Sequence, residues 1–183
     1  MDIRPVFQLQ TVIKSLKDVI VPALENDNKL AHEQANLSIA MLNLVQEKLP
    51  LWYRFDCDEL TRFIELAEKL QEQSKSLKIA DRTLLKDLDS CIDAGRDVLS
   101  RAKADPSELL DVNFNLREKI GKLIKCVYAE PSNENIKGTE TAVIAHAKEQ
   151  LIRERSWLIA QGWESDPSSI PAIESLIETV SGR

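Results

Sequence analysis

The sequence is poor in the residues that form most nucleotide and metal sites. Its 183 residues include 5 glycines, 3 cysteines and 2 histidines. The glycines are scattered at positions 95, 121, 138, 162 and 182, so they cannot form a glycine-rich loop that cradles phosphate. Neither His32 nor His146 follows a glutamate by three residues, as the di-iron bundles require. These absences argue against nucleotide-dependent enzymes and histidine-metal enzymes.

Cysteine is also too sparse for a disulfide framework. Cys57, Cys91 and Cys126 are odd in number, far apart, and form no C-x-x-C pair. Such a pattern favours a reducing compartment over a secreted scaffold or a structural zinc site. The N-terminal residues contain no apolar signal segment, and no run of 18 apolar residues occurs anywhere. We therefore expect a cytoplasmic protein that does not span a membrane.

Positive charge is the minority charge in this chain. The formal net charge is -6 and the isoelectric point is about 5.1. An acidic chain lacks the positive field that attracts phosphate backbones or anionic lipids, so neither nucleic acid nor membrane is an expected partner. Two carboxylate pairs, Asp56/Asp58 and Asp87/Asp89, are the remaining candidates for a magnesium site. Residues two apart in a helix point in different directions, so the sequence predicts no metal and no cofactor.

Apolar residues, at 43% of the chain, are abundant and recur with a helical period. Leu9, Ile13, Leu16 and Ile20 alternate spacings of three and four, which places them on one helical face. Similar stripes recur along the chain, and no strand-like alternation appears. The breaks between stripes come at the following points: residues 25–28, Pro50, residues 71–76, Asp105-Pro106, residues 131–138 and Gly162. The sequence predicts an all-α antiparallel helical bundle of about five to seven helices.

The first two helical segments allow two interpretations. The polar run 25–28 indicates a turn, and hence a helical hairpin. However, Leu30, Leu37 and Leu44 continue the seven-residue phase of Leu9 and Leu16, which would suit one long bent helix. The hairpin is the favoured interpretation, and Pro22 is expected to kink or end the first helix.

The expected domain organisation is a bundle over residues 1–163 and a helical tail over residues 164–183. Gly162 is a natural helix terminator because it tolerates a positive φ angle. Ser165-Asp166-Pro167 then opens a short final helix. The tail would dock on the bundle or on a partner subunit.

Two groups of residues are candidates for an interaction surface. The first is an aromatic and basic connector between helices, expected to plug the core or to form a docking patch: Trp52, Tyr53, Arg54 and Phe55. The second is one face of the sixth helix, opposite a predicted core stripe that includes Ile144, Leu151 and Leu158. It is either solvated or a partner surface, since Trp and Arg dominate interface energetics: His146, Gln150, Arg153 and Trp157.

Two polar residues fall in or near predicted apolar stripes. Asn113 interrupts the stripe of the fifth helix, and Arg155 lies near that of the sixth. Buried polar groups must find partners, so these residues would either fix helix register or anchor a ligand in an aliphatic cavity.

One stretch resembles a known pattern. Residues 21–25, with the sequence Val-Pro-Ala-Leu-Glu, together with Ala31 and residues 35–39, resemble an uncharacterised bacterial family of small helical proteins. Genes of that family often lie near phosphotransferase-like and acyl-CoA dehydrogenase-like genes. The resemblance covers about the first quarter of the chain and implies a bacterial cytoplasmic protein, an accessory to acyl-CoA metabolism. The family has no established activity to carry over to particular residues.

The sequence favours a non-catalytic helical interaction or accessory protein, with a protein partner or a homo-oligomer as its expected state. The alternative is a bundle that binds a small molecule or acyl chain, with Asn113 and Arg155 lining its cavity. An enzyme of unrecognised type ranks third, because no nucleophile and base occur in a familiar motif.

Overall fold

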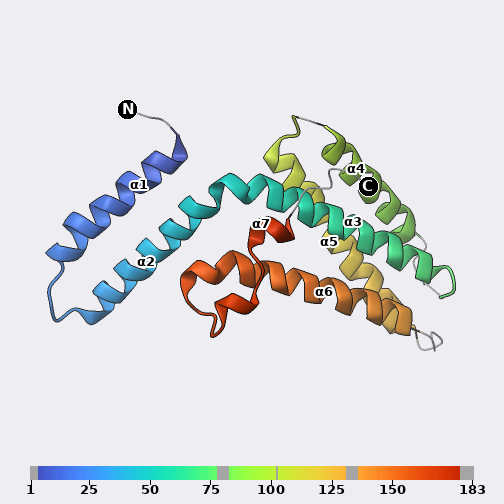
Figure 1. Ribbon diagram of the computed structural model, residues 1–183. Coiled ribbons are helices and arrows are strands. Elements are labelled where there is room, and N and C mark those ends of the chain that lie inside the picture. Colours follow the sequence, from blue (N-terminus) through green and yellow to red (C-terminus); the bar gives the residue numbers. More distant parts are fainter. Residues whose placement is uncertain (1–3, 78–82, 102, 131–135, 178–183) are drawn as a thin grey trace. The chain divides into compact units, whose positions relative to one another are not determined.

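The structure is a computed structural model that describes residues 4–77, 83–101, 103–130 and 136–177. Within these ranges every regular element is helical, and no strand is present. In the described part of the chain, six α-helices have 11 to 24 residues each, and a seventh has a single turn (Figure 1). The predicted all-α fold is confirmed. None of the helices in the described ranges is both long enough and apolar enough to cross a bilayer.

The contacts within the chain divide it into two compact units. Unit 1 comprises Met1–Trp52 and Glu154–Ile173, and unit 2 comprises Tyr53–Arg153 and Glu174–Arg183. This division differs from the expected boundary at residue 163. The chain passes from unit 2 back into unit 1 between Arg153 and Glu154, and the expected domain organisation stays a prediction.

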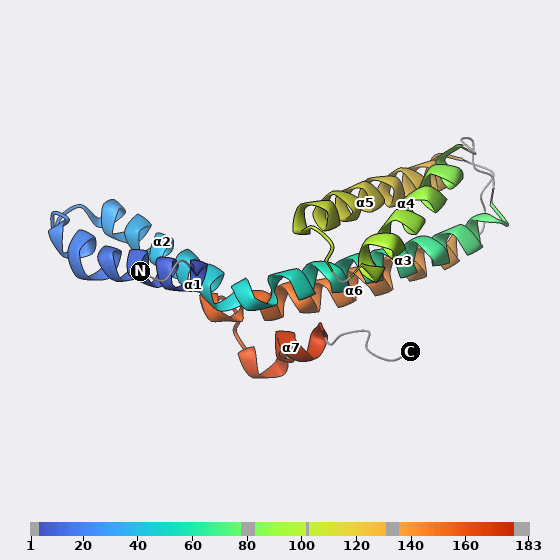
Figure 2. The same cartoon turned by 90° about the horizontal axis from the view of Figure 1, so that it is seen from above.

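Unit 1 contains a helical hairpin. Its elements are α1 (Pro5–Ser15), the π-helical turn η1 (Leu16–Ile20), the 3-10 turn η2 (Val21–Ala23), α2 (Lys29–Lys48) and the 3-10 turn η3 (Leu49–Leu51). The first two α-helices lie side by side and run in opposite directions (Figures 1 and 2). The favoured hairpin is therefore confirmed, and the single bent helix is wrong.

Local chemistry explains the turn of this hairpin. Pro22 lies in the 3-10 turn η2, where its missing N–H removes a donor that would continue the α-helix. Leu24 then adopts an extended conformation with ψ 143°. Asn28 caps α2, because its Oδ1 accepts a hydrogen bond of 3.1 Å from the N–H of Ala31.

Four long helices belong wholly or mainly to unit 2. They are α3 (Trp52–Ser74), α4 (Thr83–Ser100), α5 (Pro106–Ala129) and α6 (Lys137–Leu158). The core comes mainly from α3, α4 and α5, and its most deeply buried side chains are Leu60, Ala67, Leu88, Leu109, Leu116 and Leu123. Asp105 caps α5 by accepting a 2.8 Å hydrogen bond from the N–H of Ser107, as the Asp-Pro pair predicted.

The expected connector over residues 52–55 is instead the first turn of α3. Asp56 is consequently inside the helix and not at its N-cap, and its side chain is buried. The 3-10 turn η3 around Pro50 already redirects the chain, so no further connector is needed.

Other helix boundaries differ by a few residues. The expected break over residues 71–76 is later, since α3 continues to Ser74. Lys137 begins α6, so the expected loop over 131–138 is too long at its end; residues 131–135 lie outside the described part. Asp81, which the sequence would allow as a cap for the fourth helix, also lies outside it.

The predicted core stripe of α6 is wrong. Ile144 and Leu151 are 53% and 54% exposed, whereas Arg153, on the opposite face, is only 1% exposed. Arg153 lies nine residues after Ile144, which is about two and a half helical turns and therefore the other side of the helix. The helix buries a polar face and exposes an aliphatic one.

The C-terminal segment contains less helix than expected. After the 3-10 turn η4 (Ile159–Gln161), Gly162 has a φ of +72° and ends the helix as predicted. Only the 3-10 turn η5 (Pro167–Ser169) and the one-turn α7 (Ile173–Leu176) follow. Pro171 separates them, and its missing N–H prevents a continuous helix.

Two glycines provide a test of this backbone. Gly121 is inside α5, and a Cβ built there meets no other atom within 4 Å. We expect Gly121→Ala to raise the free energy of unfolding by about 0.5–1 kcal/mol, because alanine loses less backbone entropy in a helix. Gly162→Ala should lower it by about 1 kcal/mol, because an L side chain is strained at positive φ. Urea denaturation followed by circular dichroism measures both, and a destabilised Gly121→Ala would contradict the open position at 121.

Candidate functional site

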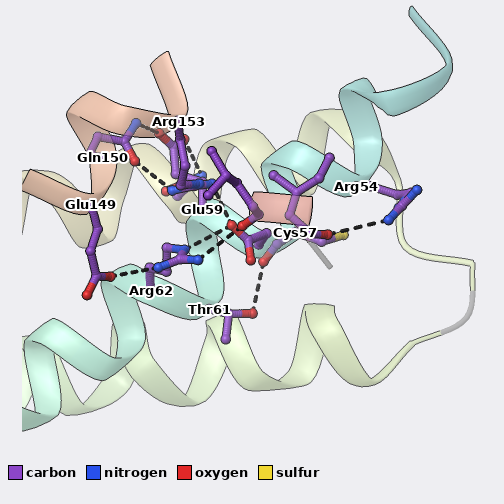
Figure 3. Close-up of polar contacts among 12 residues, drawn as sticks. Arg54, Cys57, Glu59, Thr61, Arg62, Glu149, Gln150 and Arg153 are labelled. Carbon is purple, nitrogen blue, oxygen red and sulfur yellow. Dashed lines mark hydrogen bonds and ion pairs between the residues drawn. The ribbon is translucent and has the colours of Figure 1, made fainter. Parts of the chain in front are cut away.

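The most concentrated polar structure in unit 2 is a group of side chains between α3 and α6 (Figure 3). We call it the polar cluster. It comprises Asp56, Asp58, Glu59 and Arg62 of α3, Asn113 of α5, and Glu149, Gln150 and Arg153 of α6.

Arg153 is the most buried charged residue of the cluster. Its Nη2 lies 2.6 Å from Oδ2 of Asp58, and its Nη1 donates a 2.7 Å hydrogen bond to Oε1 of Gln150. The guanidinium also lies over the ring of Phe55, 4.8 Å from its centroid. Burial lowers the pKa of Arg153, and the charge of Asp58 opposes that shift. An arginine remains protonated even so, and a buried cation must be paired.

Arg62 extends the cluster in three directions. Its Nε donates to Oδ2 of Asp58 at 3.0 Å, and its Nη1 pairs with Glu149 at 2.7 Å. Its Nη2 donates to the backbone carbonyl of Leu176 at 3.2 Å. Asp58 therefore lies between two guanidinium groups. Arg62 also fixes the position of the chain at the end of α7.

Glu59 joins three helices. Its Oε2 accepts a 2.9 Å hydrogen bond from Nδ2 of Asn113, and its Oε1 accepts one of 3.0 Å from Nε2 of Gln150. Asn113 is only 2% exposed, so the bond satisfies its buried amide nitrogen, while its Oδ1 has no hydrogen-bond partner among the described residues. The register-fixing role expected for Asn113 stays a prediction.

Arg155, the second polar residue singled out from the sequence, has a different environment. It lies in unit 1, its side chain is 44% exposed, and two of its nitrogens contact Glu164 at 2.9 and 2.7 Å. An exposed ion pair of this kind does not line an enclosed cavity. Asn113 and Arg155 thus each have a partner within their own unit.

Asp56 is the one carboxyl group of the cluster without a stabilising partner. It is 7% exposed, and none of the described residues donates a hydrogen bond to it or forms an ion pair with it. Burial is the larger cause that raises the pKa of Asp56 to about 6, and repulsion from Glu59 is the smaller cause. This carboxyl can therefore gain and lose a proton near neutral pH.

The nucleophile and metal chemistry available in the described part is slight. Burial raises the pKa of the Cys57 thiol above its ordinary value, so little reactive thiolate is present. Among the described residues no three His, Cys, Asp or Glu side chains gather closely enough to hold a metal ion. The acidic pairs Asp56/Asp58 and Asp87/Asp89 accordingly find other roles: Asp58 and Asp87 pair with Arg153 and Lys119.

Two hollows lie along α3 and α6. The smaller has a volume of about 50 Å³, room for one or two water molecules, and borders the polar cluster through Arg62, His146 and Glu149. A wider groove of about 620 Å³ adjoins it through Lys69. The groove is lined by the small residues Gly138, Ala142 and Ala145 and by polar side chains, and no large aliphatic or aromatic residue lines it, unlike a typical ligand pocket. Neither hollow is lined by Asn113 or Arg155.

The residues singled out as interaction candidates divide between exposed and buried positions. Trp52 is 43% exposed and meets Trp157 edge to face, with ring centroids 5.6 Å apart. Tyr53 is 40% exposed, whereas Phe55 is half-buried. Arg54 is also half-buried, and its Nη2 lies 3.5 Å from the carbonyl oxygen of Ile177.

The expected polar surface on α6 is mainly an internal contact. His146 packs on Phe63 with ring centroids 4.8 Å apart, and burial lowers its pKa, so it is neutral at pH 7. Gln150 and Arg153 bond within the polar cluster. In this arrangement Arg153 is not available to a partner.

Sequence reasoning missed Asp58, Glu59 and Arg62 as members of one site. Asp58 and Arg62 have the i,i+4 spacing of a helical ion pair, which is the available local signal. Their contacts with α6 span about 90 residues and have no local signature.

The buried ion pair predicts unequal effects for two arginines of α6. Arg153→Ala should lower the free energy of unfolding by about 3–5 kcal/mol, because the change removes one partner of a buried pair and leaves a cavity. Arg155→Ala is the matched control and should change stability little, since its pair is exposed. Chemical denaturation of both variants tests the difference, and equal losses would contradict the burial of Arg153.

The raised pKa of Asp56 predicts that the difference in free energy of unfolding between the parent chain and its Asp56→Asn variant depends on pH. The pKa of Asp56 is about 6 in the folded protein against 3.8 ordinarily, so folding favours its protonated form. The charged form destabilises the fold as pH rises from about 4 to about 6. The variant, which carries no charge, should be more stable than the parent by about 2–3 kcal/mol above pH 7. Near pH 4 the two should match; denaturation at each pH measures the gap, and a constant gap would contradict the assignment.

The chain finds no match among protein-family models, curated proteins or solved structures. The resemblance of residues 21–39 to a bacterial family of helical proteins therefore stays a prediction.

Proposed function

We propose that this chain is a non-catalytic helical interaction protein, which binds an acidic amphipathic helix of another protein along the outer face of α6. The observation that carries the proposal is the exposure of an aliphatic stripe on that helix. Ile144, Ala147 and Leu151 are spaced by three and four residues, so they stack on one side, and all three are exposed.

The exposure of this stripe has a physical cause. A buried guanidinium is stable only beside its counter-charge, so Arg153 must face Asp58 on α3. Gln150 and His146 lie on the same face of α6 as Arg153, so they also face α3. The rotation that satisfies these polar groups turns Ile144 and Leu151 outward.

An aligned stripe differs from the scattered apolar residues that occur on any protein surface. Seven residues separate Ile144 from Leu151, the spacing at which a second helix packs along a first. Such stripes serve helix-to-helix recognition, in which a few aliphatic anchors carry the binding energy.

The charge on this face favours an acidic partner. Lys148 lies between Ile144 and Leu151 on the same side of the helix, and it forms no ion pair with any residue in the described ranges. A carboxylate on the partner helix would pair with it at the rim of the contact.

The three thiols are consistent with action in a reducing compartment such as the cytoplasm. Cys57, Cys91 and Cys126 are all free and only partly buried. In an oxidising compartment such thiols would be open to intermolecular disulfide formation.

The proposal predicts a site-specific cross-link. The photo-reactive residue p-benzoylphenylalanine, placed at position 151 of the full chain in native cells, should give a discrete adduct upon irradiation. Mass spectrometry of the adduct should identify an amphipathic helical peptide with Asp or Glu near its apolar residues. Combining Ile144→Ser with Lys148→Glu should reduce the adduct about tenfold, the effect of losing 1.4 kcal/mol of binding energy.

The matched control carries the same photo-reactive residue at position 90, because Ser90 is exposed on α4. Equal adducts at positions 90 and 151 would contradict the proposal. So would an adduct that is unchanged by Ile144→Ser and Lys148→Glu, provided circular dichroism shows the same helix content.

A further inference from the structure

The hairpin of unit 1 exposes more large apolar side chains than it buries. Within α1 and α2 only three aliphatic residues are buried, namely Ile13, Ile39 and Leu44. Seven large apolar side chains on the hairpin are between 45% and 67% exposed. They are Phe7, Val12, Val19, Ile20, Leu30, Leu37 and Met41. A hairpin with this balance lacks part of its core.

Apolar residues on one face of α2 form a heptad stripe that is exposed over most of its length. Leu30, Leu37 and Leu44 are seven residues apart, and Met41 lies three residues before Leu44. These are the d and a positions of a coiled-coil seam. Ile39 is buried and lies two residues after Leu37, about 200° around the helix, so the seam faces away from the buried side of α2.

One end of this seam is already covered within unit 1. Leu44 is 6% exposed, and the adjacent turn η4 contacts α2 through a 3.4 Å hydrogen bond from Nε2 of Gln161 to the carbonyl of Ala40. Leu30 and Leu37, at the other end, are 67% and 50% exposed. The same stripe is therefore packed over its last turn and open over residues 30–41.

The first helix adds a second stripe of the same period. Val12 of α1 and Val19 of the π-helical turn η1 are seven residues apart and exposed, beside the half-buried Leu9 and Leu16. A two-helix hairpin with a seven-residue apolar period on both helices is half of a four-helix bundle. Another pair of helices with the same period would complete such a bundle.

Charge selects among the possible occupants of this surface. Residues 4–48 contain five basic and five acidic residues and so carry no net charge. A lipid surface or a nucleic acid would require a basic excess, which the hairpin lacks. A second copy of the hairpin is neutral as well, and it supplies the same period on both of its helices.

We infer that a second copy of this chain covers the hairpin, with the open part of α2 packed antiparallel against its counterpart. Pairing about the midpoint of residues 30–41 places Leu30 opposite Met41 of the second copy, and Leu37 opposite Gln34. Glu33 is the only acidic or basic residue between Leu30 and Met41, apart from His32, and it comes opposite the neutral Ser38. The pairing brings no like charges together and is isologous, as two-fold dimers require.

The test is the mass of the full chain in solution, measured by light scattering and sedimentation equilibrium. The parent should have twice the chain mass of 20.7 kDa. Leu37→Glu should give the single chain mass with unchanged helix content, because the side chain is half exposed within one copy. Asn36→Glu is the matched control at an exposed polar position of the same helix, and it should remain dimeric.

The antiparallel pairing has its own test. Mixing the Leu37→Glu chain with a Gln34→Lys chain should restore a dimer that contains one of each, because the new carboxylate and ammonium face each other. A mixture in which Leu37→Glu stays monomeric would overturn the antiparallel arrangement.

Three further results would overturn the dimer at this surface. They are a parent that remains monomeric at high concentration, a dimer that Leu37→Glu leaves intact, and a monomeric parent whose binding to anionic vesicles is abolished by Leu37→Glu.

The combination of Ile144→Ser and Leu151→Ser should leave the dimer unchanged. Loss of the dimer in that variant would assign self-association to α6 and not to the hairpin. The dimer is thus tested separately from the partner helix proposed for α6.

Discussion

The ion pair between Arg153 and Asp58 is the constraint on which the arrangement of α6 depends. A guanidinium with 1% exposure is stable only beside a carboxylate, and Asp58 lies at the start of α3. Arg62 shares that carboxylate, while Gln150 bonds to both Arg153 and Glu59. The register of α3 against α6 is thus set by directional polar contacts, which tolerate less sliding than an aliphatic interface does. The outward face of α6 is a consequence of this register.

The two units balance apolar and polar contacts differently. Unit 2 has a continuous aliphatic core, with Leu60, Leu88, Leu109 and Leu116 fully buried, and it can use some of the resulting stability to hold a costly set of buried charges. The hairpin of unit 1 has no comparable core. Its stability must come from the 154–173 segment within the same unit and from whatever covers its open seam.

Most of the helices could be predicted from the sequence, but the orientation of α6 could not. Stripes such as Leu109, Leu116 and Leu123 in α5 coincide with the buried face, because the side chains there find only aliphatic neighbours. In α6 the same periodic pattern marks the exposed face. The period of apolar residues indicates which side chains share a helix face. It does not indicate whether a distant counter-charge will require the opposite face to be buried.

The candidate site shows the same limit at the level of single residues. Asp56 resembles a helix cap in sequence, since Glu59 follows it by three residues. Asp56 lies inside α3 because Pro50 ends the previous helix and residues 52–55 already form the first helical turn of α3. Asn113 was recognisable as a polar interruption of a core stripe. Its partner Glu59, 54 residues away, becomes apparent only when α3 and α5 are packed.

The way residues 176 and 177 are held has a consequence for how this sequence can change in evolution. Arg54 and Arg62 contact the main-chain oxygens of Ile177 and Leu176, which every amino acid possesses. Replacing the exposed Glu174 therefore leaves both acceptors in place, whereas inserting or deleting one residue just before position 176 would present different oxygens to the two arginines. Ile177, at 1% exposure, would also leave its buried position. In descendants of this chain we expect the length of this segment to be preserved while its exposed residues diverge.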